Sequence, residues 1–207
     1  ALGAIYLIDQ ATKYPRTRWL MGRARLKTLK ETTFQTFMDI SRTMGFKNGE
    51  HWTLNSQSNI ITVYNGSEIL LKDLYYYPKD PEFEELGSLE LTGAFIDECS
   101  QVRKKAVDMV SSRIRYKLDG YNLIPKLLLT CNPAKNWTYT DYYKPWKEGT
   151  LSEDKAFIPS FLDDNPHISQ HYRKNLLDLD VTSKERLLFG NWEYDDAPNR
   201  LIEYAAI

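Results

Sequence analysis

Two short apolar runs end in residues that could bind and activate a nucleotide. The run Gly93–Ile96 leads into Asp97 and Glu98, and a second run ends in Thr130 and Asn132. This pattern is typical of buried parallel strands that carry functional groups at their carboxyl ends. An acidic pair suits a magnesium–nucleotide site, and a Thr with an Asn could detect a phosphate or position a water.

These residue types predict ATP hydrolysis with Mg²⁺. Asp97 would orient the hydrated metal ion, and Glu98 would activate the attacking water. Thr130 and Asn132 would sense the γ-phosphate, and Gln101 would reach the same site from the following helix. An apolar run ending in Asp-Glu is also common where acids cap a helix. The order and spacing of the two runs, and the cationic segment between them, favour the catalytic interpretation.

One element that such a site requires is missing from the sequence. The chain contains no G-x-x-x-x-G-K-[ST] loop to hold the phosphates. In this kind of fold the loop comes directly before the first helix, whose N-terminus faces the phosphates. The sequence opens with residues suited to the start of such a helix, so we expect the loop to precede Ala1.

Four arginines are candidates for contacting phosphate. Arg23 and Arg25 follow a predicted strand, and Arg113 and Arg115 lie in the cationic segment after Glu98. Any of them could act as an arginine that stabilises the transferring phosphoryl group. The first pair could equally be a surface charge pair, and the second pair could belong either to a basic face or to a solvated helix face.

The elements that must position these residues alternate between helix and strand. Helices are predicted at 1–13, 26–44, 102–118, 138–146, 168–178 and 183–189, the last with Ser183 as its N-cap. Strands are predicted at 17–22, 51–54, 59–64, 68–71, 93–96, 126–130 and 156–161, with a hairpin turn at Asn65-Gly66. This order predicts an α/β fold with a mostly parallel sheet flanked by helices and an antiparallel hairpin insertion.

The bulk composition allows one sizeable core. The chain has 207 residues, 42% of them hydrophobic, and a formal net charge of −1. Overall charge therefore does not indicate a nucleic-acid partner, although basic residues gather in two segments. The two cysteines lack metal-ligand spacing, and His167 and His171 share an i, i+4 spacing but have no apparent third ligand. No apolar run is long enough to span a bilayer, so no membrane partner is expected.

The pattern resembles the large terminase subunit of tailed bacteriophages, in its N-terminal ATPase domain. The segments that carry this resemblance are 19–30, 89–98, 112–115, 129–133, 164–168 and 186–192. The last two are the more distinctive, because ATPases in general do not need them. The match covers nearly the whole chain.

The resemblance implies a P-loop ATPase of the additional-strand, catalytic-Glu type. Asp97 would be the Walker B acid, Glu98 the catalytic base, and Thr130 to Asn132 the coupling motif. Residues 1–160 would form the ATPase core without its phosphate loop, 161–192 a lid subdomain, and 193–207 the start of a linker to a nuclease domain. Nothing in this sequence matches that nuclease.

The resemblance also implies partners and a location. These are sequence-independent double-stranded DNA, the portal protein, the small terminase subunit, and further copies of the chain in a ring. The place of action would be the bacterial host cytoplasm, at the procapsid. Two alternatives stay open: a helicase-like or other P-loop ATPase with a different task, and a degenerate binding module without catalysis.

Overall fold

The chain divides into two compact units. The structure, a computed structural model, describes residues 1–195. The first unit spans Ala1–Cys131 and the second begins at Asn132. The first unit therefore ends earlier than the predicted ATPase core of residues 1–160. The assignments of 161–192 as a lid and of 193–207 as a linker stay predictions, and residues 196–207 lie outside the described part.

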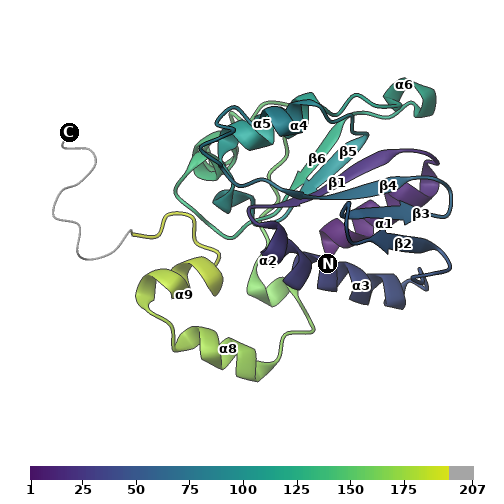
Figure 1. Ribbon diagram of the computed structural model, residues 1–207. Helices are drawn as coiled ribbons and strands as arrows, with labels where there is room; N and C mark the ends of the chain where they lie inside the picture. Colours follow the sequence, from purple (N-terminus) through teal and green to yellow (C-terminus); the bar gives the residue numbers. More distant parts are fainter. Residues whose placement is uncertain (196–207) are drawn as a thin grey trace. The chain divides into compact units, whose positions relative to one another are not determined.

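The first unit alternates helices and strands (Figure 1). Its elements in chain order are α1 (Leu2–Lys13), β1 (Arg18–Arg23), α2 (Leu26–Glu31), α3 (Thr33–Thr43), β2 (Trp52–Asn55), β3 (Ile60–Val63), β4 (Glu68–Asp73), α4 (Glu84–Gly87), β5 (Gly93–Ile96), the 3-10 turn η1 (Cys99–Gln101), α5 (Lys104–Ser112), α6 (Leu118–Tyr121) and β6 (Lys126–Leu129).

All six strands of the first unit form one sheet in the order β2-β3-β4-β1-β5-β6. The strands β4, β1, β5 and β6 run parallel, whereas β2 and β3 are antiparallel additions. The predicted fold class, a mostly parallel α/β sheet, is confirmed. The hairpin predicted at Asn65-Gly66 forms between β3 and β4, but β4 is also a central parallel strand beside β1.

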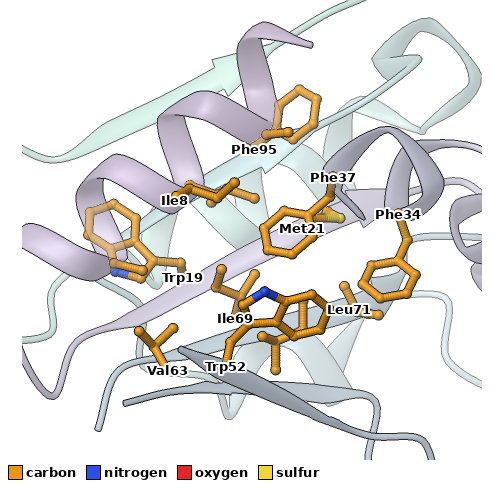
Figure 2. Close-up of a cluster of buried hydrophobic side chains, with 14 of the residues drawn as sticks. Ile8, Trp19, Met21, Phe34, Phe37, Trp52, Val63, Ile69, Leu71 and Phe95 are labelled. Carbon is orange, nitrogen blue, oxygen red and sulfur yellow. The ribbon is translucent and has the colours of Figure 1, made fainter. Parts of the chain in front are cut away.

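One face of this sheet packs against α1 and α3. Alternate residues of β1, Trp19 and Met21, enter a core that includes Ile8 of α1 and Phe37 of α3 (Figure 2). Trp52 of β2 closes the cluster, with its ring edge against Phe37 at 5.5 Å between centroids. Burial of such large apolar side chains is the main stabilising contribution, because each removes a large area from water.

The opposite face of the sheet carries the strand residues that alternate with those of the first cluster, such as Trp19 and Met21. Leu20, Ala94 and Ile96 are buried there but do not join the first cluster. The helix α5 has three buried residues on one side, and Figure 1 shows it beside the β5–β6 end of the sheet. Both faces of the central strands are thus covered, as a parallel sheet requires.

Two predicted helices of the first unit differ from their sequence pattern. The helix predicted over 26–44 breaks at Thr32, which has φ −127° and ψ −73°, and becomes α2 and α3. The helix predicted over 102–118 ends at Ser112. After Ser112 the chain instead pairs with Leu91, whose N–H donates to the Arg113 carbonyl at 2.9 Å.

The second unit is described from 132 to 195 and is mainly helical. Its elements are a π-helical turn η2 (Tyr139–Tyr143), α7 (Lys144–Lys147), the 3-10 turn η3 (Leu162–Asp164), α8 (Gln170–Leu177) and α9 (Val181–Leu187). The strand predicted at 156–161 does not form. Phe157 packs instead against Trp146 and Trp192, with ring centroids 5.1 Å and 5.4 Å away.

The two ends of the described second unit are joined to each other. The Arg186 side chain donates to the Pro133 carbonyl at 2.8 Å, and the Lys135 N–H donates to the Tyr194 hydroxyl at 3.2 Å. The N-cap of α9 is Asp180, not Ser183 as predicted. The Asp180 carboxylate accepts from the Ser183 N–H at 3.0 Å, so the helix begins two residues earlier.

Among residues 1–195, we find no helix with the length and apolar character needed to cross a membrane.

Candidate active site

Asp97 lies at the centre of a polar cluster in the first unit. Its Oδ2 accepts from the Thr33 hydroxyl at 2.5 Å and from Arg23 Nη1 at 3.1 Å. Its Oδ1 accepts from the Thr130 hydroxyl at 2.9 Å. Hydrogen bonds to a charged acceptor are roughly twice as strong as neutral ones, so these three donors fix the carboxylate in one orientation.

The parallel register brings these residues together. Gly22 of β1 pairs with Ile96 of β5, so the next residues, Arg23 and Asp97, leave the sheet at the same edge. The backbone N–H of Asp97 donates to the Gly22 carbonyl at 2.9 Å, which continues the ladder by one bond. Thr130 follows β6 at this edge, next to the acid, and its role as a sensor stays a prediction.

Three side chains at this edge were missed by sequence reasoning. Thr32 and Thr33 sit at the break between α2 and α3, and both hydroxyls accept from Arg23 Nη1, at 2.7 Å and 3.2 Å. A signal was present, because two adjacent β-branched hydroxyl residues disfavour a continuous helix. Asp73 ends β4 and accepts from the Leu26 N–H at 3.1 Å, where α2 begins.

Glu98 adopts a backbone conformation that is unusual for its residue type. Its φ of +49° and ψ of +46° place it in the left-handed region, which costs a non-glycine residue about 1–2 kcal/mol. The turn is held on both sides. The Cys99 N–H donates to the Thr130 carbonyl, and the Gln101 N–H donates to the Glu98 carbonyl, both at 2.9 Å. Such strain recurs at functional sites, where the surrounding structure holds a side chain in a required direction.

A cysteine follows each of the two polar segments: Cys99 comes after Glu98, and Cys131 comes after Thr130. A hydrogen bond with Cys131 is the largest cause that raises the pKa of the Cys99 thiol, and burial adds to it. The negative charges of Glu98 and Asp97 act in the same direction. Cys99 is therefore a protonated, buried packing residue at neutral pH rather than a nucleophile.

A pocket of about 230 Å³ opens beside this cluster within the first unit. Its wall combines polar groups of the cluster with the first residues of α1; the lining residues are Ala1, Leu2, Gly3, Ala4, Met21, Thr33, Thr36, Phe95, Asp97 and Thr130. The N-terminal end of α1 thus faces the same space as Asp97. Free backbone N–H groups and the helix dipole favour anions at such an end.

The other predicted site residues lie in different places. Gln101 ends the turn after Glu98 and is exposed. Asn132 opens the second unit and is described only with that unit. Arg25 precedes α2, and its guanidinium stacks on the Tyr75 ring at 3.2 Å.

Arg113 and Arg115 do not share an edge with Asp97. Both belong to the segment that pairs with Leu91, which precedes β5, whereas Asp97 follows β5. Arg113 donates to the Gly87 carbonyl at 3.0 Å, and Arg115 lies 3.8 Å from Glu90. Within one copy of the chain, these two arginines are thus at the amino end of the strand that carries the acids.

The donor set beside the pocket fits a magnesium ion. Mg²⁺ takes oxygen ligands and is commonly held by one or two carboxylates together with waters and substrate phosphates. Asp97 supplies one carboxylate, and Thr33 and Thr130 supply hydroxyl oxygens. In the described part of the chain, no group of three or more His, Cys, Asp or Glu side chains could hold a metal alone. A metal at Asp97 would therefore depend on water and phosphate for its other ligands.

The fold and site define a class: a parallel α/β sheet with acids at the carboxyl edge, facing the start of a helix. A family model described as phage terminase large subunit matches residues 3–188. The chain belongs to this family. A comparison with curated proteins found no match.

Solved structures agree on the fold. The large terminase from a thermophilic bacteriophage superposes with a TM-score of 0.70 at 18% identity, covering 92% of this chain and 44% of that one. The same terminase was also solved in complex with ADP, with a TM-score of 0.71. The large terminase ATPase domain of Thermus phage P74-26 matches with a TM-score of 0.55 at 14% identity, covering 91% of this chain and 80% of that one. Our chain thus spans less than half of the first of these terminases.

Proposed function

We propose that this chain is the ATPase domain of a phage terminase large subunit, which couples ATP hydrolysis to translocation of double-stranded DNA into a procapsid. Family membership over residues 3–188 supports the assignment. The observation that carries the chemistry is the convergence of Arg23, Thr33 and Thr130 on Asp97, next to a pocket that α1 enters with its N-terminal end.

The residues have the following roles in this proposal. Asp97 orients the Mg²⁺ of the nucleotide, and bound Mg²⁺ would neutralise charge on the phosphates. Glu98, whose backbone is held in the left-handed region, accepts the proton of the attacking water. Thr130, bonded to Asp97, reports γ-phosphate occupancy to β6, and Asn132 transmits this change to the second unit. Gln101 is a further polar group, at the end of the turn that follows Glu98.

The phosphate-binding loop belongs directly before α1 in this proposal. The support is geometric, because Ala1, Gly3 and Ala4 line the same pocket as Asp97. A loop ending at Ala1 would present its backbone N–H groups, and a lysine, to phosphates in that pocket.

The remaining assignments concern the assembly. Arg23, which contacts Asp97, is placed to contact phosphate within one chain. Arg25 stacks on Tyr75 and would have to leave that ring to do so. Arg113 and Arg115 would act on another copy in a ring or on DNA phosphates. Such contacts to DNA would fix the motor on the backbone without reading sequence. The partners are double-stranded DNA, the portal protein and the small terminase subunit, in the host cytoplasm at the procapsid.

The test is Glu98→Gln in the complete protein. The substitution keeps size and hydrogen bonding but removes the base, so we expect ATP turnover to fall by about 10²–10⁴-fold while nucleotide affinity is retained. Phosphate release measures turnover, and a fluorescent ATP analogue measures binding.

Glu50→Gln is the matched control. Glu50 is exposed, its carboxylate lies 3.1 Å from Lys47 in the segment before β2, and neither residue has a role in this chemistry. Near-normal hydrolysis by the Glu98 variant, with the control also near normal, would exclude Glu98 as the base. ATP turnover by the complete protein without DNA packaging would favour a helicase-like ATPase. Failure to bind any nucleotide would favour a degenerate module.

A further inference from the structure

Arg23 occupies the carboxylate that the proposed function assigns to the metal. Its Nη1 lies 3.1 Å from Asp97 Oδ2 and also donates to Thr32 and Thr33. The side chains of Arg23 and Asp97 are only 13% and 24% exposed. This pair is therefore a largely desolvated ion pair, unlike surface pairs, which are screened and contribute little.

The backbone places the two residues side by side. Arg23 and Asp97 extend two adjacent parallel strands in register, and the Gly22–Asp97 hydrogen bond fixes their separation. The pairing of the two strands thus places the Arg23 guanidinium close to Asp97. A positive charge this close to the carboxylate repels a divalent cation approaching the same oxygen.

Arg23 also keeps an unused donor. Its Nε is buried and has no hydrogen-bond partner within the described residues. An arginine has five N–H donors in a planar fork that matches phosphate oxygens. Thr33 and Asp97, two of its partners, line the pocket beside which it lies.

We propose that Arg23 is an exchangeable counter-ion: it holds Asp97 in the absence of a divalent cation and transfers to γ-phosphate oxygens when the metal–nucleotide enters. The proposal rests on the proposed function for its second half only. Arg23 would thereby make Asp97 a poor site for a bare cation and a good site for a cation that arrives with phosphate.

The first experiment titrates Mn²⁺ alone, followed by electron paramagnetic resonance, against the complete protein and its Arg23→Gln variant. Removing the competing charge should tighten Mn²⁺ binding about tenfold. Arg23→Lys keeps the charge and should bind Mn²⁺ as the wild type does. Equal or weaker binding by Arg23→Gln would overturn the counter-ion role.

Arg18→Gln is the matched control. Arg18 begins the same strand and makes a more exposed ion pair, with its Nε 2.8 Å from Glu68 Oε2, at the opposite edge of the sheet. We expect this variant to bind Mn²⁺ as the wild type does. If Arg23→Gln does not fold, as judged by circular dichroism, Arg23→Met serves as the uncharged variant of similar length with the same expected tightening.

The second experiment compares ATPγS with ADP, each with Mg²⁺, by calorimetry. If Arg23 transfers to phosphate, Arg23→Gln should weaken ATPγS binding about tenfold more than ADP binding, because one charged contact is lost. An equal loss for both nucleotides would assign Arg23 a purely structural role. If the wild type binds neither nucleotide while the Mn²⁺ result holds, the proposed function fails but the counter-ion role stands.

Discussion

At the scale of single residues, the site depends on how one carboxylate is held. Asp97 receives hydrogen bonds from three side chains that lie on β1, α3 and the end of β6. A carboxylate held by three donors has little freedom to rotate, so a metal ion or water bound to it would be held in one orientation. The left-handed Glu98 next to it has its backbone fixed by the turn that follows.

Thr33→Val tests the part of this arrangement that the sequence did not reveal. Valine keeps the shape of threonine but cannot donate to Asp97, so a bond of 2.5 Å is lost. We expect the free energy of unfolding to fall by about 1–2 kcal/mol and ATP turnover to fall by about tenfold. Urea unfolding and phosphate release measure the two effects.

Thr43→Val is the matched control in the same helix. Its hydroxyl is exposed and, within residues 1–195, bonds only to the Asp39 carbonyl, at 3.0 Å. If both variants lost the same stability and activity, the Thr33 hydroxyl would have no special role at Asp97.

At the scale of elements, α1 approaches the sheet closely because two positions lack a side chain. A Cβ on Gly3 would overlap the Phe95 ring, and one on Gly93 would overlap the Trp19 ring. Both rings belong to the core that joins α1 to β1 and β5. The approach matters for function, since it brings the start of α1 into the pocket beside Asp97.

Gly93→Ala should therefore destabilise the first unit. The buried Trp19 cannot move aside, and the Tyr6 hydroxyl lies 2.9 Å from the same added atom. Overpacking of this kind costs about 1–3 kcal/mol in the free energy of unfolding. Chemical denaturation measures it, with Gly120→Ala as the control, because an added Cβ there meets nothing within 4 Å. Equal stability of the two variants would mean that the core yields more readily than its packing indicates.

Elements were predicted well where one local signal decided them. The strand β5 is a continuous apolar run, and its burial on both faces follows directly from that composition. The prediction missed the helix break at Thr32 and placed the end of the helix α5 later than Ser112. In both places the apolar periodicity continues, but contacts to Arg23 and to Leu91, distant in sequence, redirect the chain.

At the scale of the whole molecule, the two units have separate cores. The first is built on a six-stranded sheet, and the second on an aromatic cluster in which Tyr143 and Trp192 stack at 5.2 Å with an interplanar angle of 10°. Phe157 packs edge-on against Trp192 in the same cluster. Because each core is internal to its unit, local unfolding of one unit need not open the other.

Trp192→Ala should open the second unit selectively. Truncating a buried aromatic residue costs about 3–5 kcal/mol, a large part of the stability of a small unit. Hydrogen–deuterium exchange should show faster exchange in α7 to α9 and unchanged protection in β1 and β5. Faster exchange throughout both units would mean that the chain unfolds as a single cooperative body.

The sequence alone determined which polar residues follow the apolar strands. Asp97, Glu98 and Thr130 follow apolar strands, and an apolar run that stops at polar residues must end at the rim of a buried sheet, since unpaired charges cannot remain in its interior. The α/β class follows from the same local patterns of hydrophobicity.

Only the tertiary structure decided which residues meet at that rim. Arg23 and Asp97 are 74 positions apart, and they touch because β1 and β5 are parallel neighbours in register. Thr33 reaches the same carboxylate because a helix breaks one residue before it. Strand order and register are set by packing over the whole sheet, so no local pattern in the sequence could specify these contacts.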